Sequence, residues 1–525
     1  REAAGADILV VNHALLLADV ALRSETGYDS SAILPPFTRL IFDEGHHLED
    51  TATSFFSSRI SRHGILQILG RLQHPRKVQR GILPRISARL GRDIPQELDV
   101  LYMEISGILE GKLVPGRLSL AETVVSVLDS LALSLLSYLK HDGKKAGERK
   151  LRLTPAVYGD PLWHEAEQAV RRLVKELTDY VAALKAFFKA CDQLPETVRE
   201  KLSGALIDLR GIRGRLEGVI RDLGVFTLQD DRLCHWFEVT GGARGMTIRL
   251  CSSPIQVAES IKSVILDRFR TVVVTSATLA VGEKFDYLKK MTGIDLLERD
   301  RVTDLILASP FDYERQAFIG IPDDIPDPTE RSFISCLEEY LLRGLIVSQG
   351  RAFVLFTSYD LLSRVFASIR EPLETAGLTP LRQGEINRHM LLNRFRRERN
   401  AVLFGTDSFW EGVDVQGKAL ELVVITRLPF RVPTEPILEA RAEHLTAMGG
   451  DPFMEYTVPQ AVIKFKQGFG RLIRSRVDRG AVLIFDSRVL SRNYGRFFLD
   501  SLPKSRITKG EGKTVLREME RFFHG

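Results

Sequence analysis

The sequence lacks any uninterrupted apolar run long enough to cross a membrane. A spanning helix needs about 20 mostly apolar residues, and the longest candidate, residues 124–139, is shorter and is interrupted by four serines and an aspartate. Low-complexity tracts and short-period repeats are also absent. With 44% hydrophobic and 27% charged residues, the 525-residue chain has the composition of a folded globular protein. We therefore expect neither a membrane protein nor a disordered one.

Cysteine is scarce. The chain has four, at Cys191, Cys234, Cys251 and Cys336, and no two have the CxxC spacing. Zinc sites and disulfide frameworks show closer or more regular spacings, so buried thiols are the favoured interpretation, and we expect a bacterial protein of the reducing cytoplasm. The net charge of +5 permits binding to a polyanion without requiring it.

A phosphate-binding loop of the form GxxxxGK[ST] is missing as well. This loop holds the β- and γ-phosphates of ATP. The nearest match, GEGKT at residues 510–514, has Ile507 where the first glycine belongs and follows no predicted buried strand, so we assign it to a C-terminal helical tail. The chain begins at Arg1 rather than at methionine. We expect the working loop to lie upstream of Arg1, and the 525 residues alone to hydrolyse ATP poorly.

Short apolar runs recur along the chain, and each is followed by polar residues. The runs are DILVV, RLIF, TVVVT, AFVLF, AVLF, ELVVIT and AVLIF. Continuous apolar runs of this length are typical of strands buried in parallel sheets. Such sheets bind ligands beyond the carboxyl ends of their strands. The pattern predicts an α/β fold with a ligand cleft, and two sheets fit it better than one.

A helical insertion is predicted between the second and third of these runs. More than two hundred residues separate Glu44 from Ser276, far more than one crossover connection needs. Apolar residues at spacings of three and four predict helices over residues 119–135, 170–188 and 206–223, the first of them starting at a capping box. We expect an all-helical insertion at residues 55–235.

The segment FDEGHH at residues 42–47 directly follows the predicted strand RLIF. Adjacent acids after a buried strand can supply a metal ligand and a base, which are the two groups that ATP hydrolysis needs. We predict that Asp43 holds Mg²⁺ through its water ligands and that Glu44 is the general base. His46 is expected to relay the nucleotide state to neighbouring segments.

The segment QGFGRLIR at residues 467–474 supplies arginines. On a helix, Gln467, Arg471 and Arg474 would lie along one face. Guanidinium groups bind phosphate with paired donors, so Arg474 is predicted to be the arginine finger, with Arg471 beside it. Gly470, in the same segment, is assigned to nucleotide binding.

The remaining candidates follow other predicted strands. Glu411 and Asp414, in GTDSFWEGVD, are predicted to face the nucleotide or partner arginines. Short hydroxyls at strand ends suit contacts to nucleic-acid phosphates, and the predicted set is Ser276, Thr278, Thr357, Ser358 and Thr406. The aromatics Phe409, Trp410, Phe430 and Phe469 could stack on bases, although core packing is favoured for most of them.

Five segments together resemble the DinG family of ATP-dependent DNA helicases, in the XPD-like branch of the second helicase superfamily. They are ADILVVNHALLLAD (6–19), FDEGHHLED (42–50), TSATL (275–279), GTDSFWEGVDVQG (405–417) and QGFGRLIRS (467–475). The resemblance implies two RecA-like motor domains, a helical arch inserted after the DEGH segment, and movement 5′ to 3′ along single-stranded DNA. It also implies ATP and Mg²⁺ as cofactors.

The resulting domain prediction is motor domain 1 at residues 1–54 and 236–300, the arch-like insertion at 55–235, and motor domain 2 at 301–525. Many relatives carry a [4Fe–4S] cluster on four cysteines, and such a cluster is possible here only upstream of Arg1. Many relatives also have alanine where this chain has Gly45, a difference that we expect to be neutral.

Three functions stay open at this point. The leading one is a monomeric helicase that acts on single-stranded or forked DNA in repair or replication. The alternative is a non-catalytic remnant that binds single-stranded DNA or a repair partner. A motor that moves on RNA is a third, because backbone contacts alone do not distinguish the sugars.

Overall fold

The computed structural model describes residues 5–26, 28, 32–93, 99–140, 148–242, 245–410, 415 and 419–524. The chain folds into two compact units. Unit 1 is built from residues 1–51, 257–433 and 442–525, and unit 2 from residues 52–256 and 434–441. Unit 2 is therefore inserted into the sequence of unit 1 at two places.

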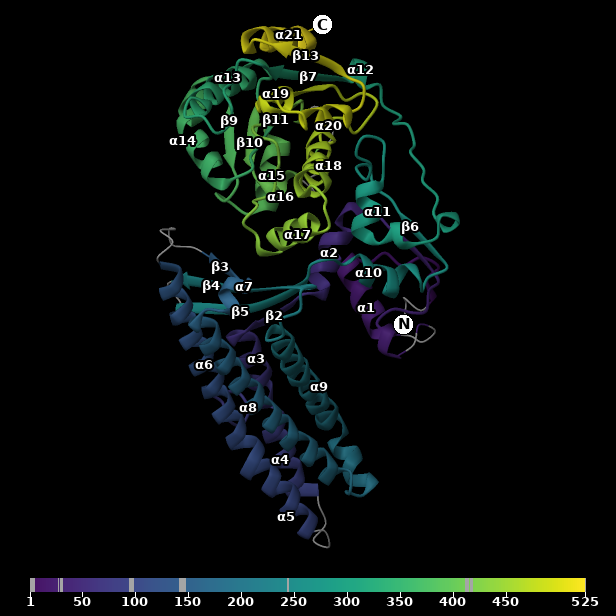
Figure 1. The fold of residues 1–525 in the computed structure, drawn as a ribbon, viewed down its shortest axis with the longest axis vertical. Helices are drawn as coiled ribbons and strands as arrows, with labels where there is room; N and C mark the ends of the chain where they lie inside the picture. Colours follow the sequence, from purple (N-terminus) through teal and green to yellow (C-terminus); the bar gives the residue numbers. More distant parts are fainter. Residues whose placement is uncertain are drawn as a thin grey trace. The chain divides into compact units, whose positions relative to one another are not determined.

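A parallel sheet forms the main part of unit 1 (Figure 1). Among the described residues it has seven strands in the order β13-β7-β12-β11-β8-β10-β9, and every pairing is parallel. The strands are β7 (Ala317–Pro322), β8 (Ala352–Leu355), β9 (Thr379–Arg382), β10 (Ala401–Gly405), β11 (Leu422–Ile425), β12 (Gly480–Ile484) and β13 (Arg506–Gly510). The runs AFVLF, AVLF, ELVVIT and AVLIF coincide with buried strands, as predicted.

Helices cover both faces of this sheet, which is why its central strands are continuously apolar. Side chains of α13, α14 and α21 pack on one face, and side chains of α15, α16, α18 and α20 pack on the other. The helices of this region are α12 (Tyr313–Gln316), α13 (Phe333–Val347), α14 (Tyr359–Thr375), α15 (Arg388–Arg397), α16 (Asp407–Trp410), α18 (Val458–Phe469), α19 (Arg488–Ser491), α20 (Gly495–Asp500) and α21 (Gly512–His524). Helix α17 (Pro436–Ala447) begins in unit 2 and ends in unit 1.

A second parallel sheet pairs β1 (Arg39–Phe42) with β6 (Thr271–Val274). The surrounding helices are α1 (His13–Thr26), α10 (Ala258–Ile261) and α11 (Asp286–Thr292), and α2 (Leu48–Phe56) continues into unit 2. The prediction of a strand at DILVV is wrong for the described residues. They form no strand there, and Ile8 and Val10 are 82% and 94% exposed, because no described strand pairs with them.

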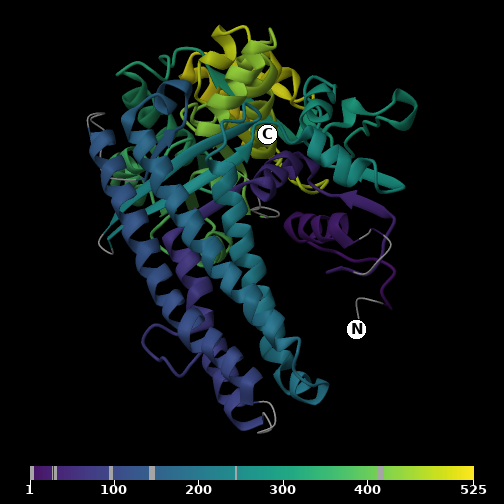
Figure 2. The ribbon, with the colours of Figure 1, turned by 60° about the horizontal axis from the view of Figure 1, so that its bottom comes forward.

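Unit 2 combines long helices with an antiparallel sheet (Figures 1 and 2). The sheet order is β2-β5-β4-β3, with β2 (Ser58–Ser61), β3 (Glu148–Arg152), β4 (Leu233–Gly242) and β5 (Gly245–Pro254). The α/β fold class with a helical insertion is confirmed, but the insertion is not all-helical. The predicted boundary at residue 235 falls inside β4, and the compact unit extends to Gln256, because β4 and β5 pack with the helices.

The helices of unit 2 bury the predicted apolar stripes. They are α3 (Arg62–Leu72), α4 (Ile82–Asp93), α5 (Asp99–Ile108), α6 (Val114–Lys140), α7 (Pro155–Tyr158), α8 (Pro161–Cys191) and α9 (Glu196–Phe226). In Figures 1 and 2, α6, α8 and α9 lie side by side. Their facing side chains, including Val124, Leu173 and Leu209, belong to one hydrophobic core.

The predicted helix start at Ser119 is wrong, because α5 and α6 continue into each other through a π-helical segment at Leu109–Leu113. The resulting stretch, Val100–Leu139, is long and apolar enough to cross a membrane by length and composition. A core helix of a globular unit meets the same description. Here Leu109, Leu120 and Leu128 are buried in the core of unit 2.

The GEGKT segment follows no buried strand, as predicted. Gly510 ends β13, an exposed edge strand, and residues 512–514 form the first turn of α21. Its helix N-terminus is not open to a phosphate, because the Gly512 N–H donates to Asp324 Oδ1 at 2.9 Å. A Cβ at Gly512 would lie 2.4 Å from the ring of Tyr340, so this glycine serves packing.

Candidate nucleotide and nucleic-acid site

The DEGH segment leaves β1 beside the TSAT segment that leaves β6. The two strands are parallel, with Phe42 opposite Val274. The Thr275 N–H donates to the Phe42 carbonyl, and the Gly45 N–H donates to the Thr275 carbonyl, both at 2.9 Å. Main-chain hydrogen bonds therefore join two segments that are far apart in the sequence.

Glu44 occupies a strained turn at this junction. Its backbone is left-handed, with φ 51° and ψ 48°, which costs a non-glycine residue about 1–3 kcal/mol. Its N–H donates to Asp43 Oδ1 at 3.0 Å, and its Oε2 accepts from Ser276 Oγ at 2.8 Å. The side chain is still 60% exposed. A fixed but accessible carboxylate suits a base that has to meet a water molecule.

Asp43 fits the way proteins hold Mg²⁺ beside a nucleotide. The described residues contain no group of three or more His, Cys, Asp or Glu side chains that could hold a metal ion by themselves. Magnesium commonly keeps several waters and binds one or two carboxylates together with substrate phosphates. The exposed carboxylate of Asp43, at the end of β1, matches that mode.

Gly45 is required by close packing, so the expectation that alanine would be neutral here is wrong. A Cβ built at Gly45 would lie 2.2 Å from Val274 Cγ1. Real carbon atoms do not approach so closely, and the β-branched side chain of Val274 has little rotamer freedom with which to move away. In this chain Val274 occupies the space that an alanine methyl group would need.

We expect Gly45→Ala to lower the free energy of unfolding by about 1–3 kcal/mol, the usual cost of overpacking. Adding Val274→Ala should recover part of this loss, because it removes the clashing methyl group. Urea unfolding of the two single variants and the double variant measures the coupling. Purely additive effects would show that the clash with Val274 is not the reason for glycine at position 45.

His46 connects the acidic turn to the QGFGRLIR segment of α18. Its Nδ1 lies 3.0 Å from Ser276 Oγ, and its Nε2 lies 2.5 Å from Gln467 Nε2. Burial, reinforced by the nearby His47, lowers the pKa of His46 to about 4. The ring is therefore neutral at pH 7 and carries one proton.

The direction of each hydrogen bond in this chain follows from donor and acceptor chemistry. The ionised Glu44 only accepts, so the Ser276 hydroxyl gives it its proton. Ser276 can then only accept from His46, which places the ring proton on Nδ1. The unprotonated Nε2 accepts from the amide of Gln467. One ordered chain thus runs from Gln467 through His46 and Ser276 to Glu44.

Acid should break this chain and destabilise the protein. Because the pKa of His46 is lower in the folded protein than its ordinary value of 6.5, the stabilisation is complete above pH 6.5 and is lost as the pH falls toward about 4. We expect the denaturation midpoint of the wild type to fall more steeply over this interval than that of His46→Asn. Parallel pH profiles would contradict the assignment. His235 in unit 2, with a pKa also lowered to about 4 by burial, contributes equally to both proteins.

Gln467 has an unmatched group at this point. Its Oε1 is buried and accepts no hydrogen bond among the described residues. A buried acceptor without a donor is destabilising by about 1–3 kcal/mol, so the group is suited to a conformational change or a ligand that supplies one. Its neighbour Lys466 donates to the Ala280 carbonyl at 2.9 Å, close to the end of the TSAT segment.

The predicted arginines do not share one helical face with Gln467. Helix α18 ends at Phe469, and Gly470 caps it, because the glycines of QGFG favour termination. Arg471 Nε and Nη2 both donate to the Trp410 carbonyl, at 3.0 and 2.9 Å. The Arg474 N–H donates to Asp478 Oδ2 at 2.8 Å. Arg471 therefore connects this segment to GTDSFW.

The predicted nucleic-acid contacts fall into two places. The hydroxyls of Ser276 and Thr278 lie at 3.0 and 3.4 Å from His46 Nδ1, so they are part of the acidic turn. Thr357, Ser358 and Thr406 follow β8 and β10, which are neighbours in the large sheet. Ser358 accepts the Leu361 N–H as the N-cap of α14.

Glu411 and Asp414 lie outside the described residues. Of the four aromatic residues considered for base stacking, Phe409, Trp410 and Phe469 are buried in the core beneath the large sheet, and Phe430 packs against it. The indole N–H of Trp410 donates to the Phe356 carbonyl. Core packing is thus their structural role.

Sequence reasoning missed the contacts made by the acids after DEGH. Glu49 is buried and accepts from the hydroxyls of Tyr287 and Tyr456, both at 3.0 Å. Asp50 pairs with both terminal nitrogens of Arg431. The signal in the sequence was the pair of acids in HLED at the start of α2. These bonds attach α2 to segments after β6 and β11.

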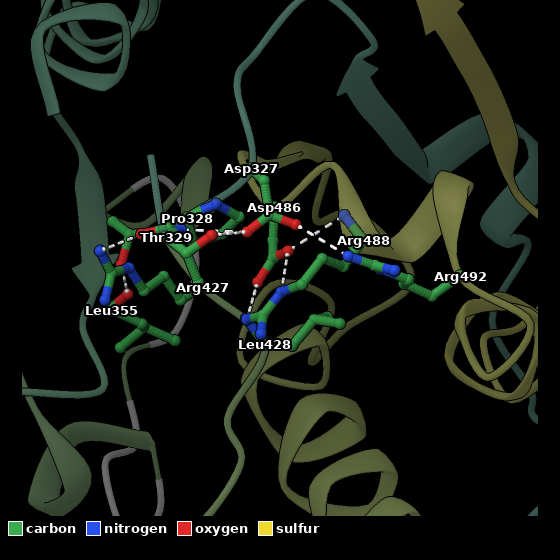
Figure 3. Close-up of polar contacts among 10 residues, drawn as sticks. Asp327, Pro328, Thr329, Leu355, Arg427, Leu428, Asp486, Arg488 and Arg492 are labelled. Carbon is green, nitrogen blue, oxygen red and sulfur yellow. Dashed lines mark hydrogen bonds and ion pairs between the residues drawn. The ribbon is translucent and has the colours of Figure 1, made fainter. Parts of the chain in front are cut away.

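A polar network joins the segments that follow the carboxyl ends of β11 and β12 (Figure 3). Asp486 is fully buried and accepts from the Leu428 N–H at 2.7 Å and from Arg488 Nη2 and Nε at 2.7 and 2.9 Å. Arg427 donates to the Pro328 carbonyl at 2.9 Å and lies over the ring of Phe333. The network fixes two loops at the edge where parallel sheets bind ligands.

Two RecA-like α/β parts, with an acidic turn at the end of one parallel sheet and a large helical insertion, define a helicase motor. The profile of the helicase C-terminal domain matches residues 341–505. The ATP-dependent DNA helicase YoaA of Haemophilus influenzae is 31% identical over 521 residues, covering 98% of this chain and 69% of that protein. The ATP-dependent DNA helicase DinG of Photobacterium profundum is 29% identical, with coverage of 95% and 68%.

The chain belongs to the family of ATP-dependent DNA helicases that includes YoaA and DinG, which confirms the resemblance found in its sequence. An XPD helicase structure aligns with 89% of this chain and 68% of its own, at 14% identity and a TM-score of 0.45. The structure of Xpd4 from S. tokodaii aligns at 15% identity with the same TM-score, over 92% of this chain and 79% of its own.

Proposed function

We propose that this chain forms the motor of an ATP-dependent helicase that moves 5′ to 3′ along single-stranded DNA. The observation that carries the proposal is the ordered hydrogen-bond chain from Gln467 to Glu44. It joins the residue proposed as the base to the segment that holds the proposed phosphate-binding arginines. Family membership supports DNA as the polymer and ATP as the fuel.

In this proposal ATP and Mg²⁺ bind beyond the end of β1. Asp43 holds the metal through its waters, and Glu44 removes the proton of the attacking water. Arg471 and Arg474 neutralise charge that develops on the phosphates, the second acting as arginine finger. Glu411, Asp414 and Gly470 complete the proposed nucleotide contacts. The phosphate loop that ATP hydrolysis also needs has no counterpart in these 525 residues.

Coupling between hydrolysis and movement would use the same chain. A change at Glu44 would alter the hydrogen bond that it accepts from Ser276, and the neutral His46 would transmit the rearrangement to Gln467. The Oε1 of Gln467 accepts no hydrogen bond among the described residues. Thr357 and Ser358 would contact the DNA backbone at the carboxyl edge of the large sheet, where Thr406 also lies. We place the activity in the bacterial cytoplasm, in repair or replication, and carried out by a monomer on single-stranded or forked DNA.

The test is ATP hydrolysis by the full-length product of the gene, measured with oligothymidylate, with oligouridylate and without nucleic acid. We expect stimulation by DNA, and unwinding of a forked duplex that carries a 5′ single-stranded arm. Equal stimulation by RNA would indicate an RNA motor instead. Binding of DNA without hydrolysis would favour the non-catalytic binder, and unwinding only from a 3′ arm would overturn the direction.

A further inference from the structure

Gln383 lies on the same sheet edge as the proposed DNA contacts, although its sequence pattern gave no reason to select it. It directly follows β9, and its N–H donates to the Phe404 carbonyl at 3.0 Å. Because β10 pairs with both β8 and β9, the residues that follow these strands form one continuous edge. Gln383 therefore follows the strand next to that of Thr406, and β10 separates it from the strand that precedes Ser358.

The backbone N–H and the hydroxyl of Thr406 both donate hydrogen bonds to the side chain of Gln383. The Thr406 N–H lies 2.7 Å from Gln383 Oε1, and the Thr406 hydroxyl donates to the same oxygen at 3.1 Å. A hydroxyl has one proton. While this arrangement holds, Thr406 has no donor left for a phosphate oxygen, which can only accept.

The orientation of the Gln383 amide is fixed by chemistry. A backbone N–H can only donate, so the atom facing it must be the amide oxygen and not the nitrogen. Gln383 Nε2 then points away from Thr406. Among the described residues it has no hydrogen-bond partner, and the side chain is half-buried. The amide thus presents two preoriented donors at the sheet edge.

Tyr359 completes the arrangement from the β8 side. Its hydroxyl donates to the Gln383 carbonyl at 3.1 Å, and 49% of the residue is exposed. Gly384 has a φ of 95°, and a Cβ there would lie 2.7 Å from the Tyr359 hydroxyl. Glycine therefore permits the close approach that holds the Tyr359 ring at the backbone of residues 383 and 384. Such a ring can stack on any base.

We propose that the Gln383 side-chain amide is the group that donates hydrogen bonds to a phosphate of the bound DNA strand, with Thr406 holding it in place and Tyr359 beside it as a stacking surface. The proposal rests on the proposed function. It assigns to Gln383 the phosphate contact that the Thr406 hydroxyl cannot make, because that hydroxyl already donates to Gln383. Basic side chains of α15, which begins at Arg388, add sequence-independent attraction for the backbone.

The variant Gln383→Glu separates donation from positioning. Glutamate keeps an oxygen for both donors of Thr406, so the local structure is retained, but it replaces the amide donors with a carboxylate that repels phosphate. We expect the affinity of the 525-residue chain for a fluorescent oligothymidylate to fall about tenfold or more. Fluorescence anisotropy measures it, and thermal unfolding checks the fold.

Two further variants keep the test decisive. Gln193→Glu, at an exposed position in the turn after α8, adds the same charge and should bind as the wild type does. Thr406→Ala removes the hydroxyl but leaves the N–H bond, so it should lose less affinity than Gln383→Glu. Gln383→Met, uncharged and of similar length, should also weaken binding if the glutamate variant fails to fold.

Each outcome has one meaning. Wild-type affinity in Gln383→Glu, or a larger loss in Thr406→Ala, overturns the assignment of Gln383 while leaving the proposed function intact. An equal loss in Gln193→Glu would trace the effect to net charge and also overturn it. A wild-type chain that binds no oligothymidylate removes the proposed function, and the role of Gln383 with it.

Discussion

Replacing Glu44 by glutamine is expected to lower the rate of ATP hydrolysis by the full-length protein about 10²–10⁴-fold, the usual contribution of a general base. Glutamine preserves the shape of the side chain, and its amide oxygen can still accept from Ser276. The hydrogen-bond chain to His46 therefore survives. What is lost is the group that can remove a proton from water.

The comparison is sharpest with a second glutamate in the same backbone conformation. Glu283 also has a positive φ, of 61°, and is exposed, so Glu283→Gln controls for the effect of a glutamine in a left-handed turn. Turnover should be unchanged in this control. Binding of a fluorescent ATP analogue should be similar in both variants. Hydrolysis that DNA still stimulates to the wild-type rate in Glu44→Gln would remove Glu44 from the mechanism.

Replacing Asp486 by asparagine is expected to lower the free energy of unfolding by about 3–5 kcal/mol, the cost of breaking a buried ion pair from one side. Asp486 is fully buried and accepts four hydrogen bonds, one from the Leu428 N–H and three from the backbone and side chain of Arg488. Asparagine places an NH₂ group against at least one of those donors and removes the charge opposite Arg488. The loops after β11 and β12 lose their common anchor.

A surface pair provides the control. Asp360 and Arg364 form an ion pair on α14 with side chains 73% and 64% exposed, and exposed pairs contribute about 0–1 kcal/mol. Asp360→Asn should therefore leave the urea midpoint of unfolding nearly unchanged. Similar midpoints for Asp486→Asn and Asp360→Asn would show that the network in Figure 3 is not a main source of stability.

Local patterns were sufficient to predict four strands of the large sheet, β8, β10, β11 and β12, but not β7, β9 or β13. Runs such as AVLF and AVLIF are buried on both faces, and only a parallel sheet covered by helices gives continuous apolar strands of that length. The stripes of α8 and α9 were equally clear, because one helical face must meet the core of unit 2. Failure began where an apolar run had no partner, as at Ile8 and Val10.

The candidate site was only partly predictable. Asp43, Glu44 and His46 could be predicted as candidates because their polar side chains directly follow a strand. The helix end at Phe469 was missed, since glycine spacing alone does not say where the helix stops. Gly45 was judged neutral because its neighbour Val274 comes from a distant strand. Gln383 could not be selected from the sequence, because the role proposed for a single glutamine depends on the residues that contact it in the folded structure.

The sequence by itself determined the class of protein, the identity of the acids and arginines, and the strands and helices that carry them, because these depend on local periodicity and on residue types in short segments. The tertiary structure decided which of these groups meet. It bonded Ser276 to Glu44, turned Arg471 toward Trp410, and set the amide of Gln383 against Thr406. Such contacts depend on strand order and register, which arise only when distant segments pack together.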